Sequence, residues 1–130
     1  ADQVGELRQA HRILNPDGRL LVRIPLAGTY AWRHYGRDWV QLDPPRHFYL
    51  HTTDSFARTA QAVGFKITRT VFDSDAFQFW GSELYRRNIS LNDPQAKTFS
   101  RVDMKEFEKR ARELNNDAQG DQACFYLKRE

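Results

Sequence analysis

The residues most suited to chemistry lie in the stretch YGRDWVQLDPPRHFYLHTTDSF, residues 35–56. His47 comes shortly after the pair Pro44-Pro45, and two consecutive prolines restrict the backbone and could hold the imidazole in place. With a pKa near its ordinary value of about 6.5, this ring could accept a proton from a reacting hydroxyl. We take His47 as a candidate general base. The alternative is that it hydrogen-bonds the loop backbone and maintains the shape of the loop.

Two charged residues flank the prolines. Arg46 could anchor an acidic small molecule through two parallel hydrogen bonds, or it could form an ion pair with Asp43 that closes the loop. Asp43 itself, next to a proline, is more typical of a turn cap than of a catalytic acid. His47 and His51 are four residues apart, a spacing that seats metals on helices. The prolines argue against a helix there and no third ligand is evident, so no metal site is predicted.

Aromatic residues gather in the same region and in a second segment further along the chain. They could form the wall of a pocket for an acceptor molecule, or pack the loop onto the core, which is the commoner use of aromatic side chains. The candidates for binding a substrate in this way are Trp32, Tyr35, Trp39 and Trp80.

The spacing of apolar residues indicates the elements that position these candidates. In chain order they are a helix over 2–14, a strand over 20–24, a helix capped by Thr53 or Asp54 and terminated by Gly64, a strand over 65–72, a helix over 76–88, a helix containing Met104 and Leu114, and a strand over 123–128. Residues 26–52 form one long connection without regular structure, and such connections tend to be functional. Alternating helices and strands predict an α/β fold with a sheet covered by helices.

The strand over 20–24 carries two further expectations. Its nearly continuous apolar sequence, LLVRI, is typical of a strand covered on both faces. Arg23 inside this run needs a partner, so we expect a carboxylate or backbone carbonyls beside it. Cys124, in the last strand, is expected to be an inert core residue.

Length and composition bound the class of protein. The 130 residues suffice for one domain, and the hydrophobic content of 40% fits a globular chain. The net charge of +3 comes from basic residues scattered along the chain, which argues against a dedicated nucleic-acid-binding surface. One cysteine fits a reducing compartment, so we expect a cytoplasmic protein. No apolar run approaches the length of a membrane span.

Several segments, in order, resemble class I S-adenosylmethionine-dependent methyltransferases, in particular a bacterial branch that acts on small molecules. LRQAHRILNPDGRLLVRIP is similar to the helix, turn and strand that lead into the fifth strand of that family. WVQLDPPRHFYLHT and DSFARTAQAVGFKI resemble the segments that follow. FQFWGSELYRRNISL is similar to an insertion before the last strand, and ACFYLKRE resembles that strand.

The resemblance implies that residues 1–130 are the C-terminal half of a Rossmann-like methyltransferase domain. They would supply its last three strands, the final one antiparallel, with flanking helices and a helical insertion over about 76–116. The intact protein would transfer a methyl group from S-adenosylmethionine to a small-molecule acceptor, and the loop over 35–56 would lie on the acceptor side.

In the family the cofactor lies over the first four strands, beside a glycine-rich loop. The seven glycines here form no G-x-G. We therefore expect that the N-terminal cofactor-binding half is absent and that this chain alone is inactive. The strand over 20–24 would then be an exposed edge that pairs with that half or with another partner. An alternative is a non-catalytic interaction module that retains the half-fold.

Overall fold

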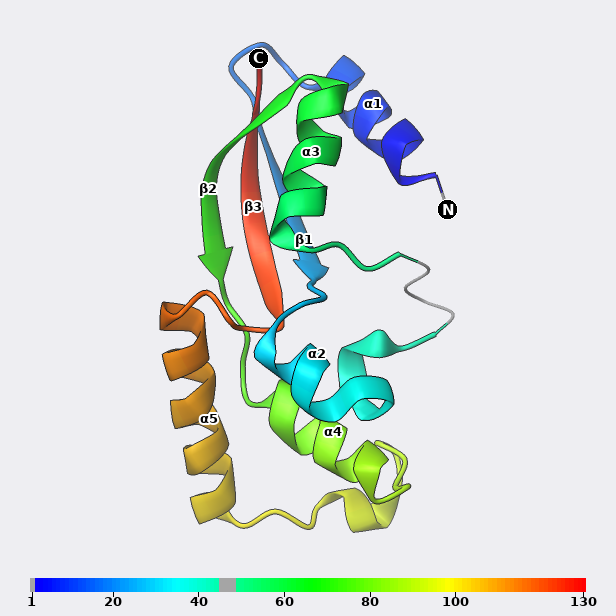
Figure 1. The fold of residues 1–130 in the computed structure, drawn as a ribbon, viewed down its shortest axis with the longest axis vertical. Coiled ribbons are helices and arrows are strands. Elements are labelled where there is room, and N and C mark those ends of the chain that lie inside the picture. The colour runs from blue at the N-terminus through cyan, green and yellow to red at the C-terminus, as the bar shows by residue number, and fades with distance from the viewer. Residues whose placement is uncertain (1, 45–48) are drawn as a thin grey trace.

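The computed structural model describes residues 2–44 and 49–130. Its helices and strands alternate along the chain (Figure 1). They are α1 (Gln3–Ile13), β1 (Arg19–Pro25), α2 (Tyr30–Tyr35), α3 (Thr53–Val63), β2 (Phe65–Phe72), α4 (Phe77–Arg86), α5 (Arg101–Asn116) and β3 (Gln122–Arg129), with short 3-10 turns at Gly36–Asp38, Val40–Leu42 and Pro94–Ala96.

The three strands form one sheet in the order β1-β3-β2. β3 is antiparallel to both neighbours, so β1 and β2 run parallel to each other and end at the same edge of the sheet. Val22 of β1 is opposite Phe125, which on its other side is opposite Thr70 of β2. The predicted α/β class, the three strands and the antiparallel final strand are confirmed. β1 is an edge strand of this sheet, as expected.

Helices α1 and α3 cover one face of the sheet, which we call the inner face. Alternate residues of the strands point there and form a core with Leu26, Phe56 and Phe65, centred on Phe125 and Leu127. α3 begins at a capping box between Thr52 and Ser55 and ends at Gly64, whose φ of 96° favours glycine. Gly64 ends the helix as predicted, whereas the cap is Thr52 and not Thr53 or Asp54, so the helix begins one or two residues earlier than predicted.

A second core lies beyond the carboxyl ends of β1 and β2, among α2, α4 and α5 (Figure 1). Trp39 and Phe79 are fully buried in it, and Ala111 of α5 packs with them. α4 and α5 lie within the insertion predicted over residues 76–116, and both are helical as expected. The molecule therefore has a sheet with two helices on one face and a helical layer beyond the edge where β1 and β2 end.

The long connection after β1 differs from its prediction. Residues 26–52 were expected to lack regular structure, but they contain α2 and two 3-10 turns. The prediction was wrong because α2 has only six residues, too few to show a helical repeat. Burial of Ala31, Tyr35 and Trp39 in the second core stabilises this local structure instead.

Arg23 has the partner expected of it. Its Nε donates a hydrogen bond of 2.8 Å to Oδ2 of Asp73, and its Nη2 lies 2.7 Å from the same oxygen. The expectation that β1 is covered on both faces is wrong for this chain, since Leu21 keeps 56% of its surface exposed. The described helices cover only the inner face.

Across the described residues, the helices are too short or too polar to cross a membrane.

The inner core yields a stability prediction. Replacing Phe125 by Ala removes a side chain that is 1% exposed and packs at a tilt against Phe56, with ring centroids 4.5 Å apart. The free energy of unfolding should fall by about 3–5 kcal/mol, measured by urea denaturation. The exposed Lys128→Ala variant on the same strand serves as control and should stay within about 0.5 kcal/mol of the parent. Equal losses in the two variants would contradict the assignment of faces.

Candidate functional site

The buried polar side chains of the described residues all lie near one edge of the sheet. They follow β1, follow β2 or precede β3, so the topology brings them to the edge where β1 and β2 end. They are Thr29, Ser74, Gln78, Ser82 and Asp121. In open α/β sheets the carboxyl edge is where ligands bind. This edge is therefore the candidate functional site.

Asp121 is the centre of the hydrogen bonds at this edge. It is 1% exposed, and its Oδ2 accepts hydrogen bonds of 2.9 Å from both Trp39 Nε1 and Gln41 Nε2. Burial raises the pKa of this carboxyl group, whereas the hydrogen bonds from Trp39, Gln41 and Ser74 act in the opposite direction. Asp121 therefore ties the loop that follows β1 to the first residues of β3.

A second group of hydrogen bonds ties the helical insertion to the same edge. Asn115 of α5 bonds the backbone of Ser74 twice: its Oδ1 accepts from the N–H at 3.1 Å and its Nδ2 donates to the carbonyl at 2.8 Å. The hydroxyl of Ser74 accepts from Gln122 N at 3.0 Å. On α4, Ser82 Oγ accepts from Val40 N at 3.0 Å. These contacts hold the loop that follows β1 and the segment that follows β2 at the carboxyl edge of the sheet.

Gln78 differs from these satisfied groups. Its Nε2 donates to the Asp75 carbonyl at 3.1 Å, but its buried Oε1 has no hydrogen-bond partner in the described part of the chain. Buried acceptors without a partner are rare in native proteins, and each needs an explanation. A bound hydroxyl, amine or water that donates to this oxygen would supply one.

The aromatic candidates do not gather around one cavity. Trp39 and Tyr35 are buried, and the hydroxyl of Tyr35 donates to Glu83 Oε1 at 3.1 Å. Burial and that carboxylate raise the pKa of Tyr35. Trp32 is 42% exposed, and the half-buried Trp80 packs edge-on against Phe77, with centroids 4.6 Å apart. Two of the four thus pack the loop onto the core, which is the alternative use considered for them.

The candidate base and the candidate anchor of the loop lie outside the described residues. Arg46 and His47 fall in the segment 45–48, so the base, the anchor and the Arg46–Asp43 ion pair all stay predictions. Groups of three or more His, Cys, Asp or Glu side chains that could hold a metal are absent from the described residues.

His51, at the end of the same loop, has a structural role. Its Nε2–H donates to Gln3 Oε1 at 2.6 Å, which leaves Nδ1 to pair with the Ser55 hydroxyl at 2.9 Å. Burial lowers the pKa of this imidazole. The ring therefore links the first turn of α1 to the start of α3.

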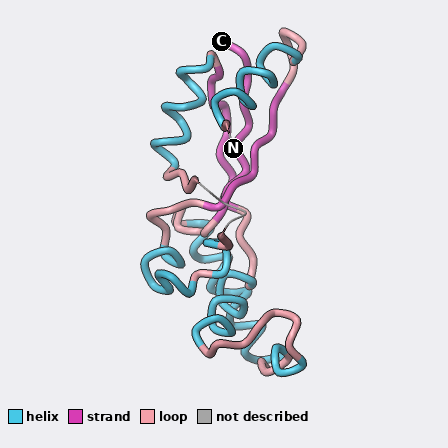
Figure 2. Tube along the Cα trace, turned by 90° about the vertical axis from the view of Figure 1, so that its right-hand side faces the viewer, coloured by secondary structure: helices cyan, strands magenta, loops and turns pink. Residues whose placement is uncertain are grey.

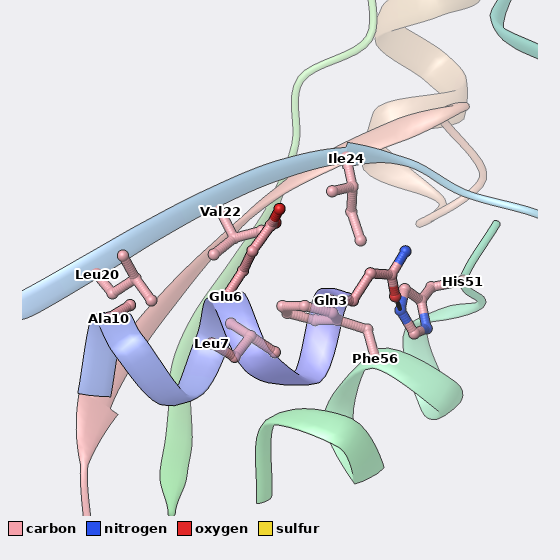
Figure 3. A pocket seen from close by; sticks show the side chains of 9 residues that line it. All are labelled: Gln3, Glu6, Leu7, Ala10, Leu20, Val22, Ile24, His51 and Phe56. Carbon is pink, nitrogen blue, oxygen red and sulfur yellow. Dashed lines mark hydrogen bonds between the residues drawn. The ribbon is translucent and has the colours of Figure 1, made fainter. Parts of the chain in front are cut away.

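A pocket of about 290 Å³ lies beside this histidine, between α1, β1 and α3 (Figure 3). Its lining residues are apolar except for Gln3, Glu6 and His51, and Gln3 and His51 lie next to each other (Figure 3). Leu20, Val22 and Ile24, the inner-face residues of β1, form one side. The pocket thus opens along the edge strand of the sheet, away from the buried polar residues of the carboxyl edge.

Sequence reasoning missed Asp121, Gln41, Gln78 and Ser82 as site residues. Asp121 follows Gly120 just before the last strand, and nothing local in the sequence distinguishes a buried aspartate from a solvated one. A signal did exist in α4, where Gln78 and Ser82 are four residues apart and interrupt an apolar helix. Polar residues on a buried helical face need partners, which points to a neighbouring segment.

Comparison with models of known protein families identifies a family for this chain. A family model described as a methyltransferase domain matches residues 1–70, more than half of the chain. No curated protein sequence matches.

Several solved structures are similar to the chain. The Galdieria sulphuraria "putative sarcosine dimethylglycine methyltransferase" aligns with a TM-score of 0.47 and 14% identity, over 97% of this chain and 47% of that one. Cyclopropane synthase MmaA2 from Mycobacterium tuberculosis aligns with a TM-score of 0.45 and 18% identity, over 95% of this chain and 48% of that one. Mycolic acid cyclopropane synthase CmaA1 aligns with a TM-score of 0.41 and 18% identity, over 98% of this chain and 52% of that one. The chain spans about half the length of these proteins.

The pKa of Asp121 yields a prediction about pH. Because the folded-state pKa is raised, the stability that this group contributes is complete below its unfolded value of about 3.9 and is lost as the pH rises through the folded value. Asp121→Asn cannot ionise and keeps an oxygen for Trp39 and Gln41. Its free energy of unfolding should therefore increase relative to the parent between acid and neutral pH, in urea denaturation series. A difference that stays constant with pH would contradict the shift.

Asp121→Ala provides the matched comparison. It leaves the donors of Trp39 and Gln41 without their acceptor, and an unsatisfied buried donor costs about 1–3 kcal/mol. The Ala variant should be less stable than the Asn variant by at least that amount at each pH tested.

Proposed function

Because the chain belongs to the methyltransferase domain family, whose model matches residues 1–70, we propose that it forms the C-terminal, acceptor-side part of an S-adenosylmethionine-dependent methyltransferase. The acceptor in this proposal is a small molecule. The observation that carries the proposal is the arrangement of the sheet: β3 is antiparallel between β1 and β2, and β1 has a free edge. This is the arrangement expected of the last three strands of the larger sheet.

The free edge of β1 supports the partner in this proposal. An apolar edge strand presents unpaired N–H and C=O groups, which proteins normally pair or cover. The 290 Å³ pocket lies along this strand and exposes its inner-face residues Leu20, Val22 and Ile24. A further strand beside β1 would pair with the edge and place apolar side chains over the pocket. We assign this role to the cofactor-binding part of the same domain.

S-adenosylmethionine does not fit the described residues of this chain by themselves. A nucleotide-type cofactor needs a glycine-rich turn between a strand and a helix. The one comparable turn contains Gly28, between β1 and α2, but it lacks a second nearby glycine and its helix has six residues. We therefore place the cofactor site in the adjoining part of the domain and derive no step through the cofactor.

The roles proposed for this chain concern the acceptor molecule. His47 takes a proton from the acceptor's hydroxyl or amine, and Arg46 binds a carboxylate or phosphate on it. Trp32 and Trp80 are the aromatic candidates that retain exposed surface. Gln78 Oε1 is free to accept a hydrogen bond, and Asp121 holds the loop through Trp39 and Gln41. In this proposal His47 and Arg46 act on the acceptor, and Asp121 keeps the loop in position.

The proposal predicts how cofactor binding depends on chain length. Calorimetric titration of S-adenosylmethionine into the 130-residue chain should give no saturable binding. The same titration should saturate for a chain expressed with the coding sequence that precedes residue 1. Micromolar binding to the 130 residues alone would overturn the proposal. A longer reading frame without cofactor binding would favour the non-catalytic interaction module.

The role of His47 is tested in the longer, active chain. His47→Gln should lower the rate of methyl transfer by about 10²-fold or more, and the parent's rate should rise with pH through the imidazole pKa while the variant's does not. His34→Gln, at an exposed position of α2, is the matched control and should retain both rate and pH profile. A slow His47→Gln variant with an unchanged pH profile would show that this histidine only maintains the loop.

A further inference from the structure

A hollow of about 430 Å³ lies at the far end of α4, apart from the carboxyl edge of the sheet. α4 runs away from the strands (Figure 1). Figure 2 shows that the helical layer to which it belongs lies beyond the strands, away from both chain termini. Gln78 in the first turn of α4 and Tyr85 in the last are separated by a rise of about 10 Å along the helix. The residues that line the hollow are Asp38, Tyr85, Asn88, Ile89 and Ser90.

The end of α4 forms one side of the hollow, and its shape follows from the local sequence. Asn88 has a φ of 58°, a left-handed conformation that asparagine adopts more readily than most residues. Its N–H donates to the Tyr85 carbonyl at 2.9 Å, and the N–H of Ile89 donates to the Leu84 carbonyl at 2.9 Å. These two bonds make a Schellman motif, which ends the helix and satisfies two of its last carbonyls. The turn therefore holds Asn88 and Ile89 in place beside Tyr85.

Asp38 comes from the loop that follows β1 and is held against α4 by the two residues after it. Trp39 is fully buried and bonds Asp121, and Val40 N donates to Ser82 Oγ of α4 at 3.0 Å. Asp38 itself is half-buried, and its carboxylate has no hydrogen bond or ion pair with the described part of the chain. The hollow therefore contains a carboxylate that the fold positions and that a ligand can use.

Two arginines at the end of α4 do not neutralise this carboxylate. The Arg86 guanidinium lies 4.7 Å from the centroid of the Tyr35 ring and donates to the His34 carbonyl at 3.2 Å. The Arg87 guanidinium lies 5.1 Å from the centroid of the Phe99 ring. None of these three partners lines the hollow. The carboxyl end of a helix carries a partial negative charge, which adds to that of the carboxylate. The hollow is therefore electronegative, although the chain as a whole is basic.

The lining suits a primary ammonium group. A carboxylate only accepts hydrogen bonds, the hydroxyls of Tyr85 and Ser90 and the amide oxygen of Asn88 can accept them, and an ammonium supplies three donors. An aromatic ring attracts cations, and Ile89 adds apolar surface for an alkyl chain. An anion would be repelled by Asp38 and by the helix end. A metal ion fits less well, because the described lining residues include a single carboxylate.

We propose that this hollow binds the ammonium group of a small alkylamine, with Asp38 as its counter-ion. The site does not depend on the proposed function. It lies at the other end of α4 from the buried polar residues of the carboxyl edge, and its lining includes none of the residues to which a role toward the acceptor is assigned. A bound amine contacts both the loop that follows β1 and the end of α4, so it joins these two segments.

The test uses n-butylammonium chloride as the probe and ¹H–¹⁵N NMR spectra of the labelled 130-residue chain as the readout. The backbone amide signals of Asp38, Asn88 and Ser90 should shift and saturate, with a Kd on the order of millimolar for so small a ligand. Added salt should weaken binding. n-Butanol has the same alkyl chain without the charge, and it should bind about tenfold more weakly because it makes no charge-assisted hydrogen bond.

Variants locate the counter-ion. Asp38→Asn keeps the size of the side chain and removes its charge, so it should weaken binding of butylammonium about tenfold. The matched control, Asp117→Asn, removes the same charge at an exposed position at the end of α5 and should leave the affinity within about twofold. Arg37→Ala removes the exposed cation next to Asp38 and should strengthen binding about twofold. Circular dichroism establishes that each variant is folded, and the comparison with butanol needs no variant.

Four results would overturn the inference: shifts that do not saturate, shifts confined to residues outside the hollow, equal affinity for butanol and butylammonium, or equal losses in Asp38→Asn and Asp117→Asn. None of them concerns the binding of S-adenosylmethionine by the longer chain, so the proposed function would stand. Conversely, a longer chain that binds no cofactor but whose hollow binds the amine would overturn the proposed function and support this site.

Discussion

The placement of β3 between β1 and β2 is the constraint on which the structure depends. Its backbone supplies hydrogen bonds to both neighbours, so neither β1 nor β2 belongs to a sheet without it. The same strand begins beside the buried carboxylate of Asp121, which holds Trp39 and Gln41. One element therefore organises the sheet and the loop that we connect with the acceptor. Changes at the start of β3 would affect both.

Much of the fold could be predicted from the sequence because its signals are local. A hydroxyl side chain caps α3 and Gly64 ends it, and both signals lie within or next to the helix's own sequence. The short helix α2 could not be predicted, since its stability comes from Trp39 and Tyr35 packing in a core assembled from distant segments. Tertiary burial of this kind leaves no periodic pattern in six residues.

In the candidate site, too, local features could be predicted from the sequence and contacts between distant residues could not. The aromatic residues of the loop were evident as a group, but their types did not reveal that Trp39 points to Asp121 while Trp32 stays exposed. Those orientations depend on contacts between residues 82 positions apart in sequence. The apolar run of β1 was interpreted as covered on both faces, which is a property of the larger sheet of the family. In this chain alone Leu21 is exposed.

The late position of β3 in the chain has a consequence for biosynthesis. Val22 pairs with Phe125, 103 positions later (125 − 22), so the ribosome must add about that many residues after β1 before the central strand can join its neighbours. During that time β1 and β2 exist as separate apolar segments with unpaired backbone on both sides, and closing so long a loop is slow. Nascent chains of this protein would therefore expose these strands for longer than a sheet built from hairpins does, and exposed strand edges favour aggregation.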